Sequence, residues 1–155
     1  MHPGSTKPQP LTKLTLRAKE LKELPKEIGH LQKVTDLSLS YNQLTSLPKE
    51  IGRLQKLTVL GLTANQLRTL PKEIGQLQNL RELWLSINGI TALPKEIGQL
   101  ENLTDLWLRD NQLTTLPKEI GHLQNLTELN LEGNPIPKEK QQEIKEWLPN
   151  CKIKF

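Results

Sequence analysis

The sequence has 155 residues, a formal net charge of +4, and only 3% aromatic side chains. It contains no apolar run long enough to cross a membrane, so membrane insertion is not expected. It also lacks a stripe of arginine and lysine interleaved with aromatic residues, which argues against nucleic-acid binding. A single cysteine, Cys151, rules out an internal disulfide.

Residues 1–10 are polar and rich in proline, without the apolar segment of a signal peptide. We interpret them as a disordered leader, a processed end or a cloning remnant. If the protein is exported, its signal has already been removed.

From residue 11 onward the chain is built on one repeated text of 23 residues. Each full copy begins with Leu-Pro-Lys-Glu-Ile-Gly, and these copies start at Leu24, Leu47, Leu70, Leu93 and Leu116. Each also follows the pattern Leu-x-x-Leu-x-Leu-x-x-Asn-x-Leu, with valine or isoleucine replacing one leucine at Val34, Ile90 and Ile136. This is the signature of a leucine-rich repeat, so the chain is expected to form a solenoid. We assign residues 11–23 to an incomplete first repeat, 24–134 to five repeats with the last truncated, and 135–155 to a C-terminal cap.

A single repeat is not expected to fold alone. Its apolar side chains in the second full copy are Leu47, Ile51, Leu54, Leu57, Leu60, Leu62 and Leu67. Their burial supplies about 10–20 kcal/mol, whereas ordering each backbone residue costs about 1–2 kcal/mol. Stacking against neighbours must supply the difference.

The local residues predict the shape of each coil. Leu57-x-x-Leu60-x-Leu62 has the period of two of a short strand. Pro48 suits the first position of a helical or 3-10 turn and Gly52 suits its end. The asparagine after each strand can satisfy backbone groups in the turn. The predicted fold is therefore an α/β horseshoe, with a parallel sheet on its concave face and short helical or 3-10 turns on its convex face.

Residues 135–155 depart from the repeat. Pro135-Ile-Pro137 is expected to open a capping helix in which Ile144, Trp147 and Leu148 lie on one side. Leu148-x-x-Cys151-x-Ile153 then reproduces the strand pattern 22 residues after Leu126-x-x-Leu129-x-Leu131. This alignment predicts a seventh strand with Cys151 in a core leucine position.

Only the outward-facing residues of the strands can indicate function, because the inward leucines are required by the fold. Adjacent repeats should place Trp84 and Trp107 side by side, since neighbouring strands lie about 4.8 Å apart. Aromatic anchors rimmed by charge are typical of a protein-binding hot spot. The expected partner-binding residues are Trp84, Trp107, Tyr41, Ile87, Arg109, Asp110, Glu82 and Asp105, with Arg81 also at the rim. The alternative is that the tryptophans only stack on each other, worth about 0.5–1.5 kcal/mol, and that the acids are a solvated face.

Catalysis, metal binding and cofactor binding are not expected. Asp105, Asp110 and Glu128 could approach one another as paired carboxylates, but no nucleophile–base pair accompanies them. His30 and His122 lie four repeats apart, too far to share a metal ion.

The repeat Leu-Pro-Lys-Glu-Ile-Gly-x-Leu-Gln-x-Leu, together with the ending Trp147-Leu-Pro-Asn-Cys-Lys-Ile-Lys-Phe155, resembles leptospiral leucine-rich-repeat proteins. This resemblance covers residues 11–155. It implies an exported or surface-associated bacterial protein that binds host cell-surface or extracellular-matrix proteins, cadherins such as E-cadherin among them. Such proteins are adhesins or virulence factors and modulate host signalling. The resemblance assigns no binding residues, so the candidate site depends on the residues alone.

The sequence is therefore compatible with three functions. The first is a non-enzymatic protein-binding module, secreted or on the bacterial surface, that binds a cadherin-like host protein through its concave face. The alternative is an intracellular scaffold or regulatory protein of the Ras-related leucine-rich-repeat kind, from which export would distinguish it. The third is self-association through the first strand, at Lys13 to Leu16, although we expect a monomer.

Overall fold

The computed structural model describes residues 11–155, so the expected leader at residues 1–10 lies outside the described residues. The described chain forms one sheet of seven parallel strands that pair in sequence order. These strands are β1 (Lys13–Thr15), β2 (Asp36–Ser38), β3 (Val59–Gly61), β4 (Glu82–Trp84), β5 (Asp105–Trp107), β6 (Glu128–Asn130) and β7 (Lys152–Lys154). Because each strand pairs with the next one along the chain, the predicted solenoid is confirmed.

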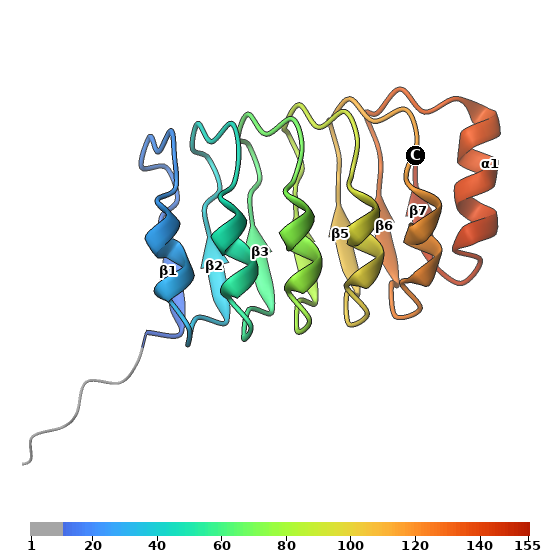
Figure 1. Cartoon of the computed structure of the whole chain (residues 1–155). Coiled ribbons are helices and arrows are strands. Elements are labelled where there is room, and N and C mark those ends of the chain that lie inside the picture. The colour runs from blue at the N-terminus through green and yellow to red at the C-terminus, as the bar shows by residue number, and fades with distance from the viewer. Residues whose placement is uncertain (1–10) are drawn as a thin grey trace, which may run out of the picture.

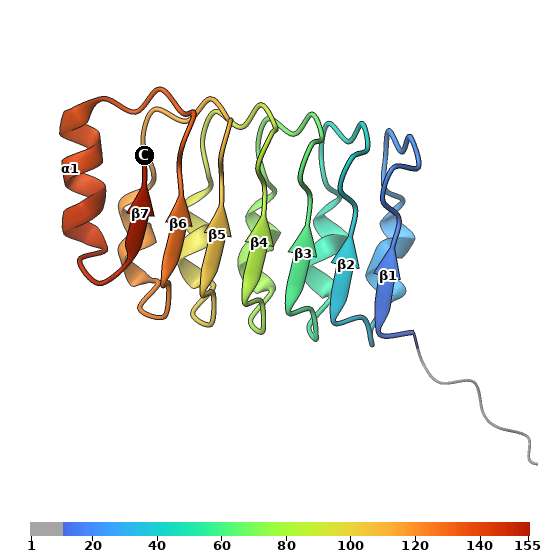
Figure 2. The ribbon, with the colours of Figure 1, turned by 180° about the vertical axis from the view of Figure 1, so that it is seen from behind.

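Short 3-10 helices form the opposite side of the stack, which Figures 1 and 2 show from its two sides. They are η1 (Lys26–His30), η2 (Lys49–Arg53), η3 (Lys72–Gln76), η4 (Lys95–Gln99) and η5 (Lys118–His122). The α-helix α1 (Lys138–Trp147) lies at the C-terminal end of the stack beside η5, where it acts as the predicted cap. No helix in residues 11–155 is long and apolar enough to span a membrane.

Two details of the 3-10 turns differ from the prediction. Pro48 is not the first residue of η2 but precedes it in an extended conformation, with φ −70° and ψ 150°. Gly52 does not end the turn, because η2 continues to Arg53. A Cβ atom at Gly52 would lie 2.7 Å from the backbone oxygen of Glu73 in the next coil. Glycine is thus needed here for the close approach of successive coils.

The core is a ladder of aliphatic side chains that runs through the interior of the stack. The strand leucines Leu60, Leu83 and Leu106 are completely buried, as are the 3-10 residues Ile51, Ile74 and Ile97 that face them. Each coil therefore buries its apolar side chains against the coils on both sides, as the energetics of a single repeat require.

The asparagines that follow the strands have the predicted structural role. The side-chain nitrogen of Asn65 donates to the carbonyl oxygens of Leu39 and Leu62, both at 3.1 Å. Its side-chain oxygen accepts from the backbone N–H of Leu44 at 3.0 Å. Each asparagine thus satisfies backbone groups of its own coil and of the preceding one, at the corner where strand pairing ends.

The predicted alignment of the last strand is wrong by two residues. Ile153 pairs with Leu129, so it is Ile153 and not Cys151 that continues the first strand leucine. The backbone N–H of Cys151 bonds to the carbonyl of Leu148, as that of Leu126 bonds to Leu123. Cys151 therefore takes the place of Leu126, and the last coil is one residue shorter before its strand. As a result Lys154 joins the column of the tryptophans, and Lys152 pairs with Glu128.

Candidate functional site

The two candidate tryptophans occupy equivalent positions on adjacent strands. Trp84 on β4 and Trp107 on β5 are register partners, and their side chains are 40% and 42% exposed. Both belong to the outward side of the sheet, which we call the sheet face. Their inward neighbours Leu83 and Leu106 are fully buried, so the alternation along the strand forces both rings outward.

Both tryptophans line one hollow of about 440 Å³ on the sheet face. Of the predicted residues, Trp84, Trp107, Ile87, Arg109 and Asp110 surround it, and Thr63, Ser86 and Asn130 complete its lining. Sequence reasoning did not select these last three because their small polar side chains resemble an ordinary solvated face. The available signal was their position. Asn130 is the register partner of Trp107, and Thr63 and Ser86 lie two residues after Gly61 and Trp84, which are register partners.

Trp84 separates this hollow from a second one of about 200 Å³ toward the N-terminal strands, which Val59 and Gly61 help to line. Its ring atom Cε3 would lie only 3.6 Å from a Cβ atom at Gly61. The missing side chain of Gly61 therefore leaves room beside the Trp84 ring. Trp84 is the side chain of the sheet face that is accessible from both hollows.

Ile87 adopts a backbone conformation that isoleucine rarely takes. Its φ is +57°, in the left-handed region, and its side chain is 48% exposed. A β-branched residue is strained there, at a cost of about 1–2 kcal/mol. The equivalent position one repeat before holds Ala64 and the one two repeats later holds Gly133. The protein thus places a large apolar side chain beside the tryptophans where glycine would be the least strained choice.

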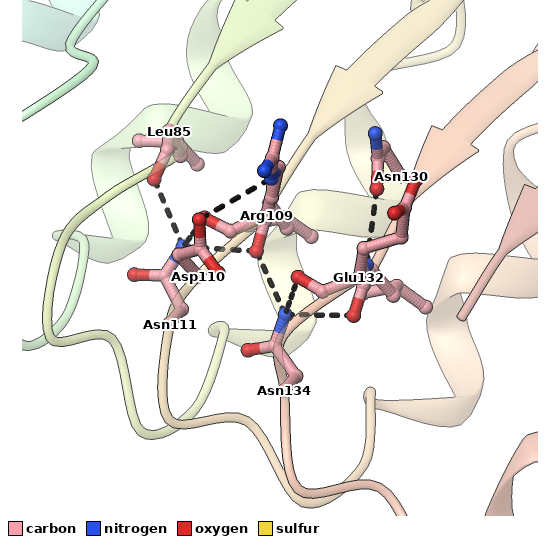
Figure 3. A network of polar contacts seen from close by, with 9 residues as sticks. Leu85, Arg109, Asp110, Asn111, Asn130, Glu132 and Asn134 are labelled. Carbon is pink, nitrogen blue, oxygen red and sulfur yellow. Dashed lines mark hydrogen bonds and ion pairs between the residues drawn. The ribbon is translucent and has the colours of Figure 1, made fainter.

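Arg109 and Asp110 form the C-terminal wall of the hollow. The Nε of Arg109 lies 3.3 Å from a carboxylate oxygen of Asp110. Asp110 also has a positive φ of 55° and donates its backbone N–H to the carbonyl of Glu132 at 2.8 Å. Figure 3 shows this pair beside the corner asparagines Asn111 and Asn134, and the side chain of Asn111 donates to the carbonyl of Leu85 at 3.0 Å. The backbone N–H of Ile87 in turn donates to the carbonyl of Arg109 at 2.8 Å, so the wall is held to the segments that follow β4 and β6.

The remaining predicted residues lie outside the hollow. Glu82 and Asp105 are register partners on β4 and β5, in the column two residues before the tryptophans. Tyr41, which is 49% exposed, follows β2 and lines neither hollow. The guanidinium of Arg17 lies over its ring, 4.6 Å from the centroid. The structure therefore does not bring Tyr41 together with the tryptophans.

The three acids considered as paired carboxylates are brought together only in part. Asp105 and Glu128 are register partners on adjacent strands, but Asp110 is paired with Arg109. Within residues 11–155 no group of three or more His, Cys, Asp or Glu side chains is placed to hold a metal ion. Burial, and to a lesser extent the carboxylate of Glu128, raises the pKa of the Cys151 thiol to about 11. The thiol is therefore protonated at neutral pH and a poor nucleophile.

Three family models match the chain. Residues 10–87 match the model described as a leucine-rich repeat region, and residues 78–136 and 125–151 match two models described as a leucine-rich repeat. A search of curated proteins found no match.

Two solved structures are similar to the chain. A leucine-rich-repeat protein of Leptospira interrogans is 50% identical over 94% of this chain and 37% of that protein, with a TM-score of 0.92. The leucine-rich-repeat ectodomain of the plant membrane receptor kinase GASSHO1/SCHENGEN3 from Arabidopsis thaliana, in complex with Casparian strip integrity factor 2, is 28% identical. That match covers 92% of this chain and 18% of the receptor, with a TM-score of 0.76.

The resemblance to leptospiral leucine-rich-repeat proteins is thus confirmed. The chain spans little more than a third of the Leptospira protein that it matches, and less than a fifth of the plant receptor.

Proposed function

Because the chain belongs to the leucine-rich-repeat family, which supports a protein-binding role, we propose that it is a non-enzymatic binding module. It takes its partner on the sheet face, across β4 and β5. The observation that supports this most strongly is the convergence of Trp84, Trp107 and Ile87 on one hollow. All three are large apolar side chains that stay between 40% and 48% exposed.

This surface is costly to the free protein. Two half-exposed tryptophans leave apolar area in water that burial would otherwise stabilise at about 25 cal/mol per Å². The left-handed conformation of Ile87 adds strain to the same hollow. Strained or exposed apolar residues that cluster in one place are typical of sites that bind something. Burial under a partner recovers the hydrophobic free energy, with tryptophan the strongest anchor.

The partner that we propose is a host cell-surface or extracellular-matrix protein, E-cadherin among the candidates, and the protein is proposed to be secreted or on the bacterial surface. The similarity to the Leptospira interrogans protein over nearly the whole chain supports this choice. Such a protein would act in adhesion and virulence and would modulate host signalling. The alternative is an intracellular scaffold of the Ras-related leucine-rich-repeat kind. Detection of the protein outside the source cells would reject the scaffold.

Binding to immobilised E-cadherin ectodomain tests both the partner and the site. Wild type is compared with the Trp84→Ala/Trp107→Ala double variant, with Tyr41→Ala as the matched aromatic control outside the hollow. We expect the double variant to lose at least about 2 kcal/mol of binding free energy, roughly thirtyfold in Kd, and the control to stay within about twofold of wild type.

Circular dichroism shows whether the variants are folded. Equal binding by folded wild type and double variant would place the site elsewhere. A wild type that does not bind the ectodomain would reject E-cadherin as the partner and favour the scaffold.

A further inference from the structure

The charges beside the tryptophans indicate the chemistry of the partner. The column two residues before them on each strand reads, from β1 to β7, Lys13, Asp36, Val59, Glu82, Asp105, Glu128 and Lys152. At both ends an acid faces a lysine on the adjacent strand. In the centre Glu82 and Asp105 face each other.

Neither acid of this central pair has a lysine or arginine as a register partner. Like charges directly opposite on adjacent strands are destabilising. Neither of the two ion pairs found in residues 11–155 involves a residue of this column, so the contrast between its centre and its ends is one of register partners. The polar contact of Asp105 is with Thr104, whose hydroxyl donates to it at 2.7 Å. Glu128, the next acid in the column, has Lys152 opposite, so the unmet negative charge is greatest at β4 and β5.

Each of these carboxylates lies next to a tryptophan on the same face. Glu82 and Trp84 are two residues apart on β4, as are Asp105 and Trp107 on β5, so each pair projects from the same side of the sheet. A cation placed over an indole ring is attracted by the ring face, and an adjacent carboxylate adds an ion pair. The same sheet already shows the first of these contacts at its N-terminal end, where Arg17 covers Tyr41 at 4.6 Å.

We propose that the partner is a protein segment that places an arginine or lysine over Trp84 and Trp107, against Glu82 and Asp105. This rests on the proposed function and names the chemistry of the same site. A large apolar side chain of the segment enters the hollow beyond the tryptophans, beside Ile87. From Glu82 to Ser86 the chain advances four residues, roughly 13 Å if extended. In an extended segment the cation and the apolar side chain are therefore about four residues apart.

Three capped heptapeptides in a glycine background test the inference directly. The first carries arginine at its second and phenylalanine at its sixth position, the second replaces arginine by glutamate, and the third replaces phenylalanine by serine. Affinities are measured from the indole N–H signals of the protein in NMR titrations. We expect wild type to bind the first peptide about tenfold more tightly than the second, the combined effect of an exposed cation–π contact and an exposed ion pair.

Two variants test whether the preference for the arginine peptide comes from Glu82 and Asp105. Glu82→Gln/Asp105→Asn is expected to reduce the tenfold preference to about twofold, the cation–π share that remains. Asp36→Asn, an acid of the same column that faces Lys13, is the matched control and should retain the full preference. The serine peptide should bind more weakly than the first peptide in all of them.

Equal affinity for the arginine and glutamate peptides would overturn the inference. So would a preference that survives Glu82→Gln/Asp105→Asn, or a failure of the first peptide to bind wild type. These results leave the proposed function standing if the Trp84→Ala/Trp107→Ala variant still loses E-cadherin. Retained binding by that variant would overturn the proposed function itself.

Discussion

Two strand pairs of the same sheet, β1–β2 and β4–β5, differ in the side chains that they expose. At β1–β2 the aromatic side chain, Tyr41, is covered by Arg17, and Lys13 faces Asp36. At β4–β5 two tryptophans are 40–42% exposed, and Glu82 faces Asp105. The backbone pairing is the same in both regions, so the difference lies in the outward side chains.

We propose that this difference separates residues that complete the fold from residues that bind a partner. At the N-terminal end the chain supplies its own cation for the aromatic ring, and the register partner of the acid is a lysine. At the centre it supplies neither, and Ile87 adds a strained apolar side chain. An interface is the simplest physical reason for leaving apolar surface and like charges unmet in the same place.

The largest expected effect is a loss of stability on replacing the corner asparagines, which hold the backbone in both regions. Asn111 is only 1% exposed, and its side chain bonds Leu85, Leu108 and Ile90. Asn111→Ala leaves these backbone groups without partners and should reduce the free energy of unfolding by about 3 kcal/mol.

Asn42→Ala, in the N-terminal coil, should cost less, about 1–2 kcal/mol, because the bonds that it loses to Lys19, Leu21 and Leu16 are only partly buried, so water can replace them. Urea unfolding of both variants measures the difference. A larger loss for Asn42→Ala than for Asn111→Ala would contradict this expectation, because the corner at Asn111 would then not be the more tightly held one.

A smaller effect is expected from relief of the left-handed backbone. Ile87→Gly should stabilise the protein by about 0.5–1 kcal/mol and weaken partner binding, because the hollow loses an apolar wall. Tyr41→Gly removes the same kind of strain, since Tyr41 has a φ of +59°, but it also removes the contact with Arg17 and should give no net gain. Thermal unfolding measures the change in stability, and binding to E-cadherin ectodomain measures the change in affinity. If Ile87→Gly is destabilising, Ile87 serves the fold rather than the partner.

The smallest effect on stability is expected from the acids of the two regions, which face another acid at β4–β5 and a lysine at β1–β2. Glu82→Gln/Asp105→Asn removes a like-charge repulsion and should raise the unfolding free energy by up to about 0.5 kcal/mol, whereas Asp36→Asn removes an attraction and should lower it by a similar amount. Both changes should shrink in high salt because the groups are near the surface. Unfolding at low and high ionic strength tests this, and equal signs for the two variants would contradict the charge contrast.

Much of the fold was predictable because every coil repeats the same constraints. The inward leucines, the corner asparagines and the proline before each 3-10 turn recur at the same spacing, so one correct coil predicts the others. The last strand was misaligned because Cys151-x-Ile153 imitates Leu-x-Leu, and only the backbone bonds distinguish the shorter coil.

The candidate site was predictable only in part. Strand alternation was enough to place Trp84 beside Trp107. The left-handed position of Ile87 was not predictable from its residue type, because the equivalent positions hold tyrosine, alanine, aspartate and glycine. Tyr41 was grouped with the tryptophans because the repeat places it on the same outward face. Its contact with Arg17 depends on side-chain geometry that the spacing does not reveal.

The most direct test of the central claim uses the three tryptophans of the chain as internal reporters. Labelling with 5-fluorotryptophan gives separate ¹⁹F signals for Trp84, Trp107 and Trp147, assigned by single Trp→Phe variants, and E-cadherin ectodomain is titrated into the labelled protein. We predict that the signals of Trp84 and Trp107 shift or broaden while that of Trp147, in the C-terminal cap, stays unchanged. A response confined to Trp147, or no response from the two sheet-face tryptophans while the ectodomain binds, would contradict the account.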